Sequence, residues 1–109
     1  MSFLSKILGL ASTDQKLESA IARGALLVDV RTPAEFAAGT VKGAINIPYD
    51  LVSRNLKQFE GKSAVVVFCR SGARSAQAKS VLDRHRVNNV INGGTWQHVA
   101  DIVNRLTNN

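Results

Sequence analysis

The sequence predicts a three-layer α/β fold, in which a small central parallel sheet of about five strands has helices on both faces. Two observations lead to this prediction. Short apolar runs alternate along the chain with segments of helical periodicity, a pattern typical of parallel strands joined by helical crossovers. The longest β-forming run, residues 65–68, contains only Val and Phe, as expected of a strand that is buried on both faces.

The chain has 109 residues, which suits one domain with an ordinary core. Hydrophobic residues make up 45% of it, a share typical of globular proteins. No segment reaches the run of ~20 apolar residues that spans a bilayer, so we expect no membrane partner and a cytoplasmic location. We expect a monomer, with a weak dimer as the alternative, and we assign residues 13–109 to the domain.

The first residues, 1–12, are predicted to form a short helix or a flexible segment in front of that domain. Their apolar residues have the spacing of one helix face. Lys6 interrupts the apolar run, which disfavours a secretory signal. The apolar positions are Phe3, Leu4, Ile7, Leu8 and Leu10.

The clearest helix start in the sequence lies at Thr32. Thr32 suits the N-cap, Pro33 suits the first helical position, and Glu35 completes a capping box. Gly39 ends this short helix. By the same reasoning we expect further helices at 14–23, 51–59, 75–86 and 96–106, and strands at 26–30, 44–47, 64–69 and 90–91.

The chain is organised around Cys69, its only cysteine, which ends the longest β-forming run. Residues 70–74, which we call the Cys69 loop, have small or cationic side chains and lead into a predicted helix. The thiol therefore lies at the carboxyl end of a central strand, where open α/β sheets place their ligand sites. Backbone N–H groups and a helix N-terminus at such a turn stabilise an anion, so the thiol should ionise easily.

The charge of the chain limits the classes of partner. The net charge is +6, from 14 Lys and Arg against 8 Asp and Glu, but the basic residues are scattered along the sequence. Aromatic residues, at 6%, are too few and too dispersed for base stacking. We therefore expect no nucleic acid partner, and a positive field that attracts small anions to the Cys69 loop.

The contents of the chain also limit its cofactors. A single cysteine excludes an internal disulfide, and no Cys/His cluster has the spacing of a metal site. His85 and His98 have no ligand or base partner nearby in sequence and are interpreted as surface residues. Neither a metal nor an organic cofactor is expected.

Three segments in this order resemble the single-domain rhodanese family, whose members are thiosulfate sulfurtransferase-like. The resemblance covers residues 16–106 and is carried by residues 29–36 with 43–48, by Val67 to Ser75 around the cysteine, and by the turn Gly93-Gly94-Thr95-Trp96. The family often has Gly-His-Ile where this chain has Gly39-Thr40-Val41, a position that is structural in the family. The resemblance implies a rhodanese-like fold.

The resemblance also implies roles for the site residues. Cys69 would be the nucleophile that carries a persulfide. The loop residues would bind the sulfur donor through their amides and through the charges of two arginines; they are Arg70, Ser71, Gly72, Ala73 and Arg74. Three further residues would support the loop: Asp29 by accepting a hydrogen bond from it, and Arg31 and Glu35 by pairing with each other at a helix start.

The implied reaction needs no cofactor. The thiolate attacks the sulfane sulfur of thiosulfate or a similar anionic donor, and sulfite departs. A thiophilic acceptor, cyanide or a thiol, then takes the outer sulfur. Two alternatives stay open: a non-catalytic interaction module, because fold alone does not determine function, and a phosphatase or arsenate reductase of the Cys-x5-Arg type. The second requires an arginine where this chain has Ser75, since Arg74 comes one residue early.

Overall fold

The computed structural model describes residues 14–108. The segment predicted as a short helix or flexible lead, residues 1–12, lies outside them. The described helices are residues 14–22, α2 (Pro33–Ala38), α3 (Ala73–Arg84) and α4 (Trp96–Thr107), and two 3-10 helices are η1 (Tyr49–Arg54) and η2 (Leu56–Phe59). The strands are β1 (Leu26–Asp29), β2 (Ile45–Asn46), β3 (Val65–Cys69) and β4 (Val90–Thr95).

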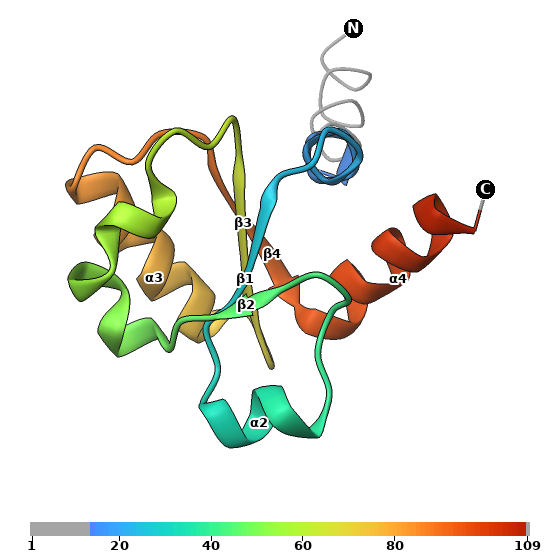
Figure 1. Ribbon diagram of the computed structural model, residues 1–109, viewed down its shortest axis with the longest axis horizontal. Coiled ribbons are helices and arrows are strands. Elements are labelled where there is room, and N and C mark those ends of the chain that lie inside the picture. The colour runs from blue at the N-terminus through green and yellow to red at the C-terminus, as the bar shows by residue number, and fades with distance from the viewer. Residues whose placement is uncertain (1–13, 109) are drawn as a thin grey trace, which may run out of the picture.

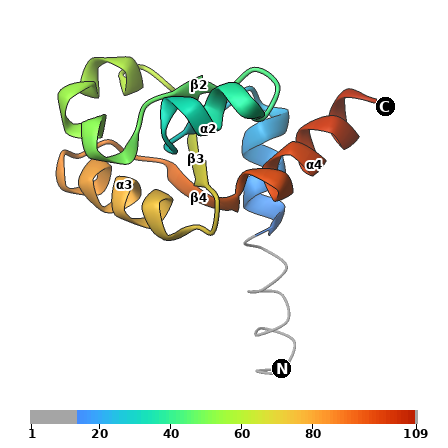
Figure 2. The same cartoon turned by 90° about the horizontal axis from the view of Figure 1, so that it is seen from below.

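The described strands form one parallel sheet in the order β2-β1-β3-β4. Four strands are present in this part of the chain, against the expected number of about five. Helix α3 and the two 3-10 helices cover one face, while α4 and the helix of residues 14–22 cover the other (Figure 1). Figure 2, seen from below, shows the same two groups of helices on either side of the strands. The predicted α/β class with helices on both faces is therefore confirmed.

Strand β3 is the centre of the core. All five of its residues are buried, and its side chains alternate between the two hydrophobic clusters of the domain. Val65, Val67 and Cys69 face α3, whereas Val66 and Phe68 face α4. This two-sided burial explains why the run has no polar residue before the cysteine.

The predicted start of α2 is confirmed. The Glu35 N–H donates to the Thr32 hydroxyl at 3.2 Å, and the Thr32 N–H donates to the Glu35 carboxylate at 3.1 Å, which together make the capping box. The cap orients the Glu35 carboxylate at the carboxyl end of the sheet. This placement becomes important because α2 lies next to the Cys69 loop.

The prediction of a single helix over residues 51–59 is wrong. The structure has the two 3-10 helices there, separated at Asn55, whose backbone is not helical. The Asn55 side-chain amide donates to the Leu51 carbonyl at 2.8 Å, so it competes with the backbone bonds of a continuous helix.

The glycine-rich turn expected at 92–94 is part of strand β4. The strand continues to Thr95 through a bulge at which Gly93 has no partner residue on β3. A Cβ at Gly93 would lie 2.7 Å from Val99 Cγ2 and 3.0 Å from Val66 Cγ1, so only glycine fits between the sheet and α4.

Candidate active site

The carboxyl ends of the parallel strands bring the predicted site residues to one edge of the sheet. Cys69 is the last residue of β3, and only three residues separate it from Ala73, where α3 begins. Gly72 makes this tight connection with a φ of +98°, a left-handed conformation that side chains disfavour. The loop therefore wraps its backbone around the sulfur.

Three groups surround the sulfur of Cys69. The Gly72 N–H donates to Sγ at 3.0 Å and the Ser75 N–H donates to it at 3.4 Å, while the Ser75 hydroxyl lies 3.5 Å away. Cys69 itself is 0% exposed. The predicted arrangement of backbone amides around a thiol at a helix N-terminus is thus present in the structure.

These contacts shift the acidity of the thiol. Burial is the largest single influence on the pKa of Cys69 and raises it. Hydrogen bonds from the Ser75 hydroxyl and from the N–H groups of Ser75, Gly72 and Ser71 together outweigh burial, so the net pKa lies below that of an ordinary thiol. Hydrogen bonding to the ionised sulfur is the physical reason for this lowering.

Asp29 and Arg31 pair with each other at the end of β1. The Arg31 Nη2 donates to Asp29 Oδ2 at 2.6 Å and Nε donates to Oδ1 at 2.9 Å, with both side chains buried. The Asp29 carboxylate also accepts from the Thr40 hydroxyl at 2.7 Å, and the Arg31 guanidinium lies 4.9 Å from the centre of the Trp96 ring. Asp29 accepts no hydrogen bond from the Cys69 loop, contrary to expectation.

Glu35 pairs with Arg74, and the expected Arg31–Glu35 pair is wrong. Arg74 donates to both carboxylate oxygens, with Nη1–Oε1 at 2.8 Å and Nη2–Oε2 at 3.1 Å. The hydrogen bond from Arg74 is the main reason that the pKa of Glu35 falls to about 2. Arg31 is already held by a carboxylate two residues away, whereas Glu35 on α2 faces the start of α3.

Arg74 connects α2 to the Cys69 loop electrostatically. The Glu35 carboxylate raises the pKa of Arg74, and the charge on Cys69 raises it further. Arg74 therefore has a fixed carboxylate partner and also contributes positive charge near the sulfur. Arg70, in contrast, is exposed at the rim of the loop and has no ion pair among the described residues.

A small hollow of about 240 Å³ lies beside the loop. Its walls combine two arginines, a carboxylate and an aromatic ring, so charges of both signs and apolar surface meet in it. Among its lining residues are Arg31, Glu35, Gly39, Arg70, Trp96 and Gln97.

Two residues near the sulfur were missed by the sequence interpretation. Ser75 is buried, with 0% exposed, and its hydroxyl also contacts Asn92 Oδ1 at 2.7 Å. A signal for Ser75 was available, because it occupies the buried face of α3 that continues through Ala78 and Leu82. Asn92 had no comparable signal, since its contact with Ser75 depends on β4 pairing with β3 in the folded sheet.

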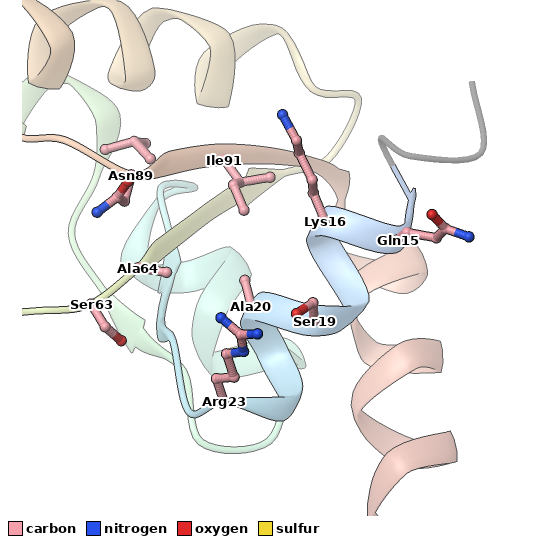
Figure 3. A pocket seen from close by; sticks show the side chains of 10 residues that line it. Gln15, Lys16, Ser19, Ala20, Arg23, Ser63, Ala64, Asn89 and Ile91 are labelled. Atoms are coloured by element: carbon pink, nitrogen blue, oxygen red, sulfur yellow. The ribbon is translucent and has the colours of Figure 1, made fainter. Parts of the chain in front are cut away.

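A larger hollow, of about 570 Å³, lies at the opposite end of the sheet (Figure 3). Lys16, Ser19 and Arg23 project from the helix of residues 14–22 on one side of it, and Ile91 of β4 lies on the other side. Its lining residues include no thiol. Size therefore does not single out the candidate site, which is marked instead by the hydrogen bonds around the Cys69 sulfur.

Other parts of the described chain add no second site. His85 and His98 are both exposed, as expected of surface residues, and His98 lies 3.1 Å from an Asp14 carboxylate oxygen. Residues 14–108 contain no group of three or more potential metal-ligating side chains. None of the described helices has the length and apolar content to cross a membrane.

The family can now be assigned from the whole chain. The profile of the rhodanese-like domain family matches residues 13–96. This chain belongs to the rhodanese-like domain family. The three segments at the ends of β1, β3 and β4 are thus the rhodanese pattern, and the family resemblance drawn from the sequence is confirmed.

Similar proteins agree on this family. A sulfurtransferase of Allochromatium vinosum is 42% identical over 67 residues, covering 62% of this chain and 63% of that protein. The thiosulfate sulfurtransferase PspE of Escherichia coli is 33% identical over 75 residues, covering 67% of this chain and 72% of that protein. A solved rhodanese from Escherichia coli, described with anions, superposes with a TM-score of 0.65 at 32% identity, covering 71% and 93% of the two chains.

Proposed function

We propose that this rhodanese-like domain is a sulfurtransferase that moves a sulfane sulfur from thiosulfate, or a similar anionic donor, to cyanide or a thiol. The observation that carries the proposal is the geometry at Cys69. A single thiol lies within hydrogen-bonding distance of two backbone N–H groups, and no side-chain base among residues 14–108 hydrogen-bonds to it. Such a setting favours an anionic sulfur and has no group suited to activating water.

The proposed reaction balances without a cofactor. The Cys69 thiolate attacks the outer sulfur of thiosulfate, the S–S bond of the donor breaks, and sulfite leaves with the electron pair. The product is a Cys69 persulfide anion. An acceptor nucleophile then attacks the outer sulfur and the Cys69 thiolate leaves, which restores the starting state. The N–H groups directed at Sγ stabilise anionic sulfur at the start and end of this cycle.

The positive charges around the loop support an anionic donor. Arg70 is exposed beside the hollow of about 240 Å³, and Arg74 contributes charge from the first turn of α3. The excess of basic residues, +6 overall, adds a field that draws anions to the protein. The names of the relatives, sulfurtransferase and thiosulfate sulfurtransferase, are consistent with this substrate class.

The phosphatase alternative has weaker support. Its loop would use an arginine to bind two phosphate oxygens in a bidentate manner. Arg74 of this loop already donates both of its Nη groups to the Glu35 carboxylate. The residue at the clamp position, Ser75, has 0% of its surface exposed. A non-catalytic module would not need the hydrogen bonds that lower the pKa of Cys69.

Intact-protein mass spectrometry tests the proposal. Because Cys69 is the only cysteine, incubation with thiosulfate should add one sulfur, roughly 32 Da, through chemistry that requires the thiolate. Cyanide should then remove the added mass and yield thiocyanate. The C69S variant should show neither event, and turnover retained in that variant would refute the persulfide mechanism.

A further inference from the structure

The hydroxyl of Ser75 has more partners than it can satisfy with its one proton. Its Oγ lies 2.7 Å from Asn92 Oδ1, 3.0 Å from the Gly72 carbonyl oxygen and 3.5 Å from Cys69 Sγ. The first two neighbours are acceptors, and an ionised sulfur would be a third. The direction of this proton therefore decides whether Ser75 stabilises the thiol or the thiolate.

The orientation of the Asn92 amide is determined by its other contacts. The Gly94 N–H donates to Asn92 Oδ1 at 2.9 Å, which requires an oxygen at that position. The Nδ2 group, on the other side, donates to the Gly72 carbonyl at 3.3 Å. The atom that faces the Ser75 hydroxyl is therefore an acceptor.

The Gly72 carbonyl is already satisfied by two donors. It accepts from the Ala76 N–H at 3.0 Å and from Asn92 Nδ2. Asn92 Oδ1, the shortest contact of the Ser75 hydroxyl, is thus the favoured acceptor for its proton. With the proton directed at Asn92, the lone pairs of Ser75 Oγ face the sulfur, an arrangement that accepts a bond from S–H but does not stabilise S⁻.

Asn92 lies in regular register on β4, just before the bulge. Asn92 pairs with Val67 in the sheet, whereas Gly94 pairs with Phe68, so Gly93 is the extra residue. Strand alternation directs Asn92 to the same face as Val90, the face on which Cys69 packs toward α3.

We propose that Asn92 is a positioning residue for Cys69, because it competes with the ionised sulfur for the proton of the Ser75 hydroxyl. In the thiol state the hydroxyl donates to Asn92 Oδ1. When the thiol releases its proton to solvent, the hydroxyl turns to donate to sulfur and gives up its bond to Asn92. The inference deepens the proposed function, since it takes Cys69 as the nucleophile.

Charged groups around the sulfur come from several elements, and they stay in place when Asn92 is changed. Arg74 on α3 is paired with Glu35 on α2, and Asp29 is paired with Arg31 at the end of β1. Arg70 lies exposed in the loop itself. Strand β4 carries no charged residue. A change in the acidity of Cys69 on substitution of Asn92 therefore reports a change in the hydrogen bond that the Ser75 hydroxyl donates.

The test is the rate of alkylation of Cys69 against pH, a measurement that needs no sulfurtransferase activity. N92A removes the shortest acceptor of the hydroxyl, while the Gly72 carbonyl keeps the Ala76 N–H as a donor, so the hydroxyl should donate to sulfur, lower the pKa of the thiol and speed alkylation at pH 7 by about threefold to tenfold. N92D keeps the acceptor oxygen and adds negative charge, so it should raise the pKa and slow alkylation. N92D also keeps an acceptor for the Gly94 N–H, which guards against a collapsed turn.

S75A provides the matched control. In an S75A background, N92A should leave the alkylation profile unchanged, because no hydroxyl proton remains to be redirected. The proposal is overturned if N92A slows alkylation or leaves it unaltered in the natural chain, or if its effect persists without Ser75. If the variants alkylate as expected but the natural chain forms no persulfide with thiosulfate, the result would count against the proposed function alone.

Discussion

The neighbouring strands β1 and β3 each end in a side chain that can be anionic, but the hydrogen-bond partners of the two side chains differ. Asp29 at the end of β1 is held by a buried guanidinium through two short hydrogen bonds and by a threonine hydroxyl. Cys69 at the end of β3 has only N–H groups and one hydroxyl around its sulfur. The two strands pair directly, with Asp29 opposite Phe68.

The difference separates an anion that stabilises the fold from one that can react. A carboxylate paired with Arg31 has its charge neutralised and its lone pairs occupied, so it supports the start of α2 and offers nothing to a substrate. Amide dipoles stabilise a thiolate without a cation bound to it, which leaves the sulfur able to form a new bond. Arg74, whose charge interacts with Cys69, is paired with Glu35 instead.

The largest expected effect comes from removing each of these two anionic side chains by mutation. D29N should leave the buried Arg31 guanidinium without a countercharge and lower the free energy of unfolding by about 3–5 kcal/mol. C69A should change the free energy of unfolding by only about 1 kcal/mol while abolishing sulfur transfer. Denaturant unfolding and thiocyanate assays on both variants measure this contrast. Equal losses of stability in the two variants would contradict it.

A smaller effect is expected at the two arginines of the Cys69 loop. R70A should raise the KM for thiosulfate roughly twofold to fivefold, because an exposed charge contributes modestly, and added salt should weaken donor binding in the natural chain. R74A should instead lower both stability and kcat, since it leaves Glu35 unpaired beside the loop. R70K should restore only part of the loss.

A neutral sulfur donor is the control for this comparison. R70A should leave the KM of the neutral donor unchanged, whereas R74A should impair both donors. If R70A impairs both donors equally, Arg70 braces the loop and does not bind the charge of the donor.

The smallest effect concerns the pH dependence of the Arg74–Glu35 pair. The pKa of Glu35 is lowered from 4.5 to about 2, so the stabilisation by this pair is complete above pH 4.5 and is lost as the pH falls toward 2. E35Q keeps the capping box, which accepts Gln, but removes the charge. The difference in melting temperature between the natural chain and E35Q should therefore shrink across this window.

D83N, in the exposed Lys79–Asp83 pair of α3, is the matched control for charge removal on the surface. It should cost little stability at any pH in the same range. A difference between E35Q and the natural chain that stays constant from pH 6 to pH 2 would show that the ion pair does not couple α2 to the loop.

Local patterns in the sequence were sufficient to place Cys69, the candidate nucleophile, at the end of a buried strand. The run from Val65 to Phe68 marks a strand buried on both faces, and the abrupt change at Cys69 marks its end. In a parallel sheet covered on both faces, every successive side chain of a strand is buried and therefore apolar. The capping box of Thr32 and Glu35 was equally readable, since its partners are three residues apart. Each of these features depends on interactions along a few consecutive residues.

The partners of the charged and polar side chains were decided by the tertiary structure. Arg74 meets Glu35 across 39 positions of sequence, and Ser75 meets Asn92 across 17, because the order of the parallel strands brings α2, α3 and β4 to one edge. Sequence spacing favoured Arg31 for Glu35, four positions away, yet Arg31 turns back to Asp29. Hydrogen bonds are short and directional, so which donor reaches which acceptor depends on the register of the assembled sheet.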